Sequence, residues 1–278
     1  MDKFKNMSLI YKLSFMVLII ILFIGVFADF LSPYDPNQVE MTNRLMGISK
    51  DHLIGTDALG RDVLSRIIHG ARVSIFLSLI ATVCTMILGT FIGLISGYCG
   101  GIIDSIIQVV VTIFQGLPGL SFMIAVAGVL GPGIKSLLIA IVVTSWAGFS
   151  RIVRGEVLKV KQEKYIEGAR ALGASHIHII IHYVLPNIFA TFIVLFTIRI
   201  GKVVLSMASL SFLGLGMQPP QADWGVMVND AKTYFRSYPH LLLAPGFSIL
   251  LLCSSINLIG DALRDIFDEK RDFFSQYL

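Results

Sequence analysis

Long apolar runs without charge recur along the chain and define its expected architecture. Runs of about 20 such residues predict helices that cross a membrane, and short polar or glycine- and proline-rich segments separate them. We predict six spans, at Leu13–Ala28, Val73–Ile95, Asp104–Leu130, Ile134–Phe149, Pro186–Phe212 and Leu241–Ile259. The expected fold class is therefore an all-α integral membrane protein with six transmembrane helices.

The first apolar run follows a positively charged start. Lys3, Lys5 and Lys12 precede it, and an excess of lysine and arginine marks the cytoplasmic side of a membrane. We therefore expect a cytoplasmic N-terminus. A positive start before an apolar run is also typical of a cleaved signal peptide, so retention of this span stays open, although five further spans favour an uncleaved anchor.

The segment from Phe30 to Arg72 is polar and is expected to lie outside the bilayer. Its SPYDP run is typical of a turn. Thr56 or Asp57 is placed to cap a short amphipathic helix at the membrane interface, which leads into the second span. The charges of that helix are either solvated or part of a gate, and the sequence leaves both interpretations open.

Two spans carry residues that change how a helix packs. Gly89, Gly93 and Gly97 recur every four residues in the second span, so one stripe of that helix lets another backbone approach closely. Pro118 interrupts the third span and predicts a kink or break at mid-membrane depth. Such a break lines the path in some transporters, and a simple packing kink is the alternative.

The polar segment Ser150–His182 lies between the fourth and fifth spans. Its excess of lysine and arginine places it on the cytoplasmic side, and counting four spans from a cytoplasmic N-terminus gives the same side. Within it, Gly173 separates two short helical stretches. We interpret this segment as a docking surface for another protein. The sixth span leads back to the cytoplasmic side, so we also expect a cytoplasmic C-terminus.

Composition agrees with a membrane protein. The 278 residues are 55% hydrophobic and 14% charged, with a mean hydropathy of +0.79, which is too apolar for a soluble globule. The net charge of +4 is explained by positive loops beside the spans, so no nucleic-acid partner is expected. Cys84, Cys99 and Cys253 are interpreted as inert thiols.

No catalytic or nucleotide-binding motif is found. GxxxxGK[ST] does not occur, so any ATP must be bound by a partner. No nucleophile with a supporting base can be argued, so we expect no enzymatic activity and no cofactor on this chain. A metal site is one interpretation of His176, His178 and His182. No cysteine or carboxylate accompanies them at helical spacing, so surface histidines are the favoured interpretation.

Two cations lie inside the fifth span. Arg199 and Lys202 are three residues apart, and each charge near the bilayer centre costs about 2.5–3.5 kcal/mol on insertion scales. They must face water, a carboxylate or an anion, unless they extend to the interface or pair with an acid of another subunit. Our hypothesis is that both line a substrate pathway, together with Pro118, and favour anionic cargo.

At the residues of the docking segment the chain resembles the permease subunits of ATP-binding-cassette importers, in the dipeptide, oligopeptide and nickel group. The family's coupling motif is Glu-Ala-Ala, three residues, Gly, then Ile-x-Leu-Pro after nine more; here Gly168 replaces the first Ala and Tyr183 the Ile. Three further signatures, GTDALGRDVLSR, SLSFLGLGMQPPQADWG and GDALRD, extend the resemblance over nearly all of the chain. The motif positions filled here are Glu167, Gly168, Ala169, Gly173, Leu185 and Pro186.

The resemblance implies a type I importer permease fold and a set of partners. Residues 1–70 form an N-terminal span with an outer loop, residues 71–262 the permease domain with a coupling helix near 165–175, and residues 263–278 a cytoplasmic tail. The implied partners are a sister permease in a heterodimer, two cytoplasmic ATPases that bind ATP and Mg²⁺, an extracytoplasmic solute-binding protein and membrane lipid. The implied mechanism is alternating access.

One short run in the C-terminal third of the chain bears on the cargo. The run WGVMVNDAKTY at Trp224–Tyr234 is similar to nickel-type members and favours nickel or a metal chelate, with di- or oligopeptides as the alternative. A secondary transporter or channel would need inverted repeats or buried acid relays, which the sequence lacks. A scaffold subunit without transport of its own is a further alternative.

Overall fold

The computed structural model describes residues 8–275, which form helices joined by turns and loops. Residues 1–7, with Lys3 and Lys5, and the last three residues of the expected C-terminal tail lie outside this range. The helices are α2 (Leu9–Val26), α3 (Ala28–Leu31), η1 (Met41–Asn43), α4 (Val63–Cys99), α5 (Gly101–Gly116), α6 (Gly119–Leu130), α7 (Ile134–Lys161), α8 (Lys164–Ala171), α9 (His176–Ile179), η2 (Ile180–Val184), α10 (Leu185–Phe212), α11 (Trp224–Ala231), η3 (Lys232–Tyr234) and α12 (His240–Ser275).

The described helices include the expected membrane spans. Helices α2, α4, α7, α10 and α12 are each long and apolar enough to cross a membrane, and α5 with α6 makes a sixth when the broken pair counts as one span. This confirms the all-α integral membrane fold. Pro118 stands at the break, where α5 and α6 meet at an angle of 92°, so the sequence correctly predicts an interruption of the third span.

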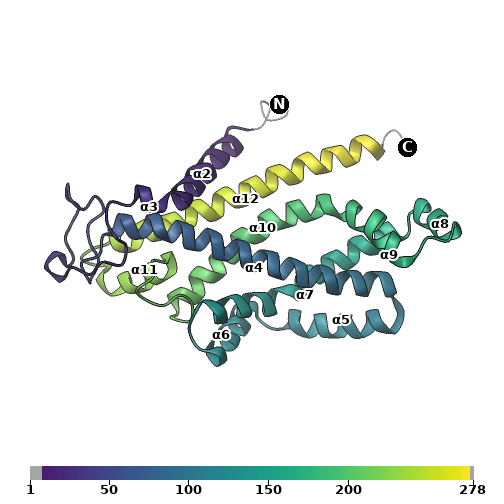
Figure 1. Ribbon diagram of the computed structural model, residues 1–278, viewed down its shortest axis with the longest axis horizontal. Coiled ribbons are helices and arrows are strands. Elements are labelled where there is room, and N and C mark those ends of the chain that lie inside the picture. The colour runs from purple at the N-terminus through teal and green to yellow at the C-terminus, as the bar shows by residue number, and fades with distance from the viewer. Residues whose placement is uncertain (1–7, 276–278) are drawn as a thin grey trace.

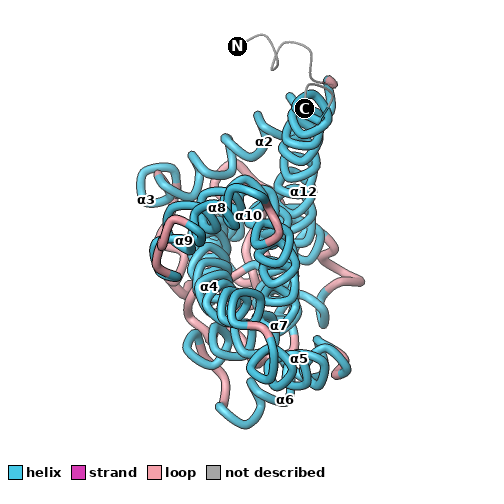
Figure 2. The backbone as a smooth tube through the Cα atoms, turned by 90° about the vertical axis from the view of Figure 1, so that its right-hand side faces the viewer, coloured by secondary structure: helices cyan, strands magenta, loops and turns pink. Residues whose placement is uncertain are grey.

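The spans form an elongated bundle around α4, α7 and α10. Helices α2 and α12 lie along one side of these three, and α5 and α6 lie along the other (Figures 1 and 2). One end of the bundle carries α8 and α9, and the other carries residues 32–62 and 213–239, including α11 (Figure 1). We call these two stretches the cap.

The glycine stripe of α4 is buried against α7. A Cβ added at Gly93 would lie 2.6 Å from the carbonyl oxygen of Ser150, and one at Gly97 would lie 2.9 Å from Cβ of Val157. A Cβ at Gly89 would meet the Phe149 ring at 2.8 Å. Two backbones approach this closely because the glycines carry no side chain, which confirms the predicted tight packing.

Helix α2 is fixed at both ends. The Tyr11 hydroxyl lies 3.2 Å from Asp265 Oδ2, so the start of α2 lies beside the C-terminal half of α12 and the two helices run antiparallel. At the other end, Arg72 of α4 donates to the Gly25 carbonyl at 2.9 Å and to both carboxylate oxygens of Asp29 at 3.0 Å. These contacts hold α2 on the bundle.

The start of α4 corrects one prediction. Thr56 and Asp57 cap no helix; they lie in a cap loop, and α4 runs unbroken from Val63 through the second span. Asp62 is the N-cap, since its carboxylate accepts from the Ser65 amide at 2.7 Å. Among the described residues, a loop that ends at Asp62 therefore precedes α4 in place of the expected interfacial helix, and Arg61, Asp62 and Arg66 are buried there.

Candidate coupling surface and membrane charges

One face of α8 anchors it to the bundle. Ile166 is fully buried and packs in an apolar cluster with Val157 of α7, Ile179 of α9 and Ile188 of α10. Ala169, one turn further along, is also buried. Residues at this spacing share one side of a helix, so the buried pair turns the opposite side of α8 outward.

Gly173 ends this helix in a specific turn. Its φ is +83°, its amide donates to the Arg170 carbonyl at 2.9 Å, and the Ala174 amide donates to the Ala169 carbonyl at 3.0 Å. This pair of bonds is the Schellman arrangement, which needs a left-handed residue after the helix. Glycine adopts that conformation without steric cost, so the motif glycine sets the direction in which the chain leaves α8.

The outward face of this end of the protein is partly apolar. Glu167 and Gly168 are exposed, and nothing lies within 4 Å of a Cβ added at Gly168. Leu172 is 91% exposed and Ile177 is 70% exposed. Apolar side chains grouped with polar ones beyond the spans are typical of a protein-docking surface.

The docking segment continues directly into a membrane helix. The π-helical turn η2 joins α9 to α10 with no intervening loop. Leu185 packs against the same apolar cluster as Ile166, and Pro186 lies in the first turn of α10. The structure thus gathers the residues matching the motif at one end of the bundle, and a displacement of α8 has a continuous helical route into α10.

The three histidines of the segment occupy its surface. His178 and His182 are exposed, and their rings stack with centroids 4.1 Å apart. His176 Nδ1 lies instead 2.9 Å from the Tyr98 hydroxyl. Within residues that the structure describes, no group of three His, Cys, Asp or Glu side chains is arranged to hold a metal ion.

Arg199 and Lys202 have different surroundings. Arg199 Nη2 donates to the Ser145 carbonyl of α7 at 3.0 Å, and its guanidinium carbon lies 5.3 Å from the centre of the Phe149 ring. Lys202 is exposed on α10. Pro118 is also exposed, at the break between α5 and α6. Arg199 therefore stabilises the contact of α10 with α7, whereas Lys202 is the cation of this pair that faces outward.

A charged network in the cap was missed by sequence reasoning. Asp57 Oδ2 lies 2.6 Å from Arg61 Nε and 3.7 Å from Arg66 Nε, and Asp230 lies 3.6 Å from Arg61 Nη2. The GTDALGRDVLSR signature contains three of these residues, but its charges were interpreted as interfacial. Asp230 comes from α11, more than 160 residues along the chain from Arg66, and no local pattern links them.

Comparisons with known proteins agree with this arrangement. Residues 89–272 match the family described as binding-protein-dependent transport system inner membrane component. The chain belongs to this family. It is also 40% identical over 262 residues to the dipeptide transport system permease protein DppC of Alkalihalophilus pseudofirmus, covering 93% of this chain and 86% of that one. The glutathione transport system permease protein GsiD of Pectobacterium atrosepticum is 38% identical, covering 91% and 84%.

Solved structures confirm the fold. An inward-facing methionine ABC transporter, MetNI, matches with a TM-score of 0.60 and 17% identity, over 72% of this chain and 96% of that one. An amino acid ABC transporter solved with histidines matches with a TM-score of 0.55 and 18% identity, over 74% and 94%. The chain thus has the type I importer permease fold, and it is a non-enzymatic, multi-pass membrane subunit of an ABC importer.

Proposed function

We propose that this chain is the permease subunit of an ATP-driven importer for short peptides. The observation that carries the proposal is 40% identity to a dipeptide permease over 93% of the chain, together with 38% identity to a glutathione permease. These relatives favour the peptide alternative over the nickel or metal-chelate cargo expected from the run Trp224–Tyr234. Resemblance in that short run carries less weight than identity across the chain.

The proposed orientation places α8 and both termini in the cytoplasm and the cap outside. The excess of lysine and arginine in Ser150–His182 supports it. The contact between Tyr11 and Asp265 supports a common side for the termini, because it brings the start of α2 beside the C-terminal half of α12. The outward cap then faces a solute-binding protein, and its loop at Pro219–Trp224 is a proposed contact.

The proposed coupling site comprises the exposed Glu167 and Gly168, the buried Ala169 that anchors the helix, and Gly173 at its turn, with Leu185 and Pro186 at the start of α10. Its exposed apolar residues support docking into a cleft of a cytoplasmic ATPase, where this chain and a sister permease would each engage one of two ATPases. ATP and Mg²⁺ are bound there and not on this chain. Closure of the ATPases moves α8, and α10 carries the displacement into the membrane, which gives alternating access.

The proposed substrate pathway still includes Arg199, Lys202 and Pro118. We propose a different role for each residue. Lys202 is the candidate for direct contact with cargo, because it is exposed on a membrane helix and a cation there needs water or an anion. Arg199 is a candidate for holding α10 against α7 at that level. Pro118 lies at the break between α5 and α6, and broken helices line the path in some transporters.

Uptake by cells that lack this gene tests the proposed function. The measured cargoes are a radiolabelled dipeptide, radiolabelled glutathione and radiolabelled nickel, each with the deletion strain and the strain complemented by the wild-type gene. We expect loss of peptide uptake, restored on complementation, and unchanged nickel uptake. A defect confined to nickel overturns the peptide assignment in favour of the metal reading.

A further inference from the structure

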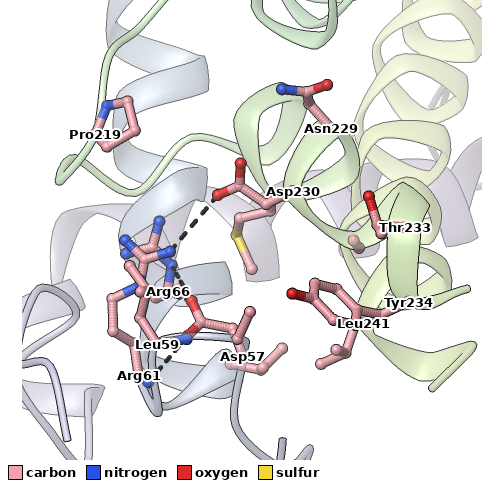
Figure 3. Close-up of a pocket in the computed structure, with 14 residues that line it drawn as sticks. Asp57, Leu59, Arg61, Arg66, Pro219, Asn229, Asp230, Thr233, Tyr234 and Leu241 are labelled. Carbon is pink, nitrogen blue, oxygen red and sulfur yellow. Dashed lines mark hydrogen bonds and ion pairs between the residues drawn. The ribbon is translucent and has the colours of Figure 1, made fainter. Parts of the chain in front are cut away.

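A cavity of about 430 Å³ opens in the cap. The loop after η1, the start of α4, α11 and the start of α12 enclose it. In Figure 3 the side chains of Asp57, Arg61, Arg66 and Asp230 lie together on one wall, and Thr233, Tyr234 and Leu241 lie on the opposite wall. The volume is in the range of small-molecule sites.

The charged wall contains two acidic and two basic side chains. The carboxylate of Asp57 already accepts three hydrogen bonds. Arg61 Nε donates to its Oδ2 at 2.6 Å, and the amides of Leu59 and Arg61 donate to its Oδ1 at 2.8 and 3.0 Å. Two carboxylates and two guanidinium groups leave this wall with no formal net charge. Such a lining suits a ligand that carries both signs.

Arg66, one of the residues that line the cavity, has a donor without a partner. Its side chain is 1% exposed, and Nη1 donates to the carbonyls of Pro36 and Pro220 at 2.8 and 3.2 Å. Nη2 is buried and has no hydrogen-bond partner among the described residues. A buried guanidinium nitrogen without an acceptor is costly, and a carboxylate is the acceptor that arginine matches best.

Asp230 is the weakly paired acid of the same wall. Its side chain is 40% exposed, and its ion pair with Arg61 is long, at 3.6 Å. Burial raises the pKa of Asp230, against the lowering effect of Arg61 and Arg66. This carboxylate therefore has free capacity to accept hydrogen bonds from an ammonium group.

We propose that the cap cavity binds a zwitterionic short peptide, with its ammonium on Asp230 and its carboxylate on the guanidinium of Arg66, whose closed-off Nη2 is reached by a small shift of that side chain. The apolar side chains of Met227 and Leu241, which also line the cavity, provide contacts for the peptide's own side chains. The choice of a peptide rests on the proposed function. The charge pattern is the independent argument that the ligand is a zwitterion.

Binding to the full-length chain in lipid nanodiscs tests this inference. The probe is dialanine, compared by calorimetry with N-acetyl-dialanine, which lacks the ammonium, and dialanine amide, which lacks the carboxylate. We expect saturable binding of dialanine and a roughly tenfold or greater loss of affinity for each blocked form, because each loses a charged hydrogen bond. These comparisons need no change to Arg66, which also anchors two cap carbonyls.

A protein variant gives the matching measurement. Asp230→Asn should weaken dialanine binding by a similar factor. The variant should still bind dialanine more tightly than dialanine amide, because the site for the carboxylate is unchanged. Asp51→Asn makes the same chemical change at an exposed cap position outside the cavity and should bind like wild type. Absence of saturable binding, equal binding of all three probes, or equal effects of the two variants would each overturn the proposal. Peptide uptake that persists alongside such a result leaves the proposed function standing.

Discussion

Two glycines of the coupling segment differ in what the backbone requires of them. Gly173 has a φ of +83°, whereas Gly168 is helical with open space around it. We predict that Gly173→Ala destabilises the turn by about 1 kcal/mol, lowers uptake and shifts the chain that leaves α8. Gly168→Ala should instead favour the helix by about 0.5–1 kcal/mol and retain uptake. Peptide uptake at equal membrane levels of each variant provides the measurement.

Equal uptake by the two variants would contradict this prediction. The comparison is matched, because each change adds one methyl group at an exposed position of the same segment. Gly168→Ala also restores the Ala that the family's motif carries at this position. The conformation at Gly173 could not be read from the sequence alone, although a glycine shortly after a helical run is a recognised stop signal.

Asp223 caps α11 at a buried position. The residue is 2% exposed, its carboxylate accepts from the Val226 amide at 3.0 Å, and burial raises the pKa of this carboxyl. Asparagine caps a helix about as well as aspartate without a buried charge. We predict that Asp223→Asn keeps or increases the free energy of unfolding at pH 7, while Asp223→Ala lowers it by about 1 kcal/mol. Thermal unfolding of the purified chain measures both.

The same residue predicts a dependence on pH. A carboxyl whose folded pKa lies above its unfolded value keeps its proton in the native state while the unfolded chain releases it. The stability that it contributes is therefore complete at low pH and falls as pH rises from about 3.9 through the folded pKa. The advantage of Asp223→Asn over wild type should grow from pH 4 to pH 7. A constant difference would show that burial does not shift this group.

At the scale of elements, the pairing of α4 with α7 depends on a surface without side chains. A Cβ at Gly93 would approach backbone oxygen and a β-branched neighbour, neither of which can yield easily. We predict that Gly93→Ala costs about 1–3 kcal/mol by overpacking and lowers the amount of folded protein extracted from the membrane. Gly128→Ala, on α6 with nothing within 4 Å, is the control and should extract like wild type.

The sequence predicted the apolar spans better than their ends. The stripe at Gly89–Gly97 and the break at Pro118 follow from local rules of packing and backbone geometry, and the structure has both. The start of α4 and the whole of α11 were missed. Hydrophobicity marks where a helix is buried in lipid, but α4 begins next to the cap and α11 is short. Contacts between segments far apart in the sequence support both, since Arg66 donates to the Pro36 carbonyl and Trp224 donates to the Ile67 carbonyl.

At the scale of the molecule, the two ends of the bundle differ in how far sequence could describe them. The coupling motif lies within one continuous stretch, so its residues were predictable as a group. The cap network joins Asp57 and Arg66 to Asp230 of a distant helix, and only the fold brings them together. The sequence places both Lys202 and Arg199 in one span. Only the structure shows that their surroundings differ, because Arg199 donates to a carbonyl of α7 and Lys202 is exposed.

The final prediction concerns transmission between subunits. Leu172 is 91% exposed at the end of α8, so replacing it should leave the fold intact, whereas an apolar contact with a partner would be lost. Burying a leucine contributes about 1.5–3 kcal/mol, so Leu172→Asp should weaken co-purification of the ATPases about tenfold or more and reduce uptake. Leu172→Met keeps an apolar side chain of similar volume and should do neither. Full ATPase association and uptake by Leu172→Asp at normal membrane levels would contradict the prediction and would exclude Leu172 from the contact with the ATPase.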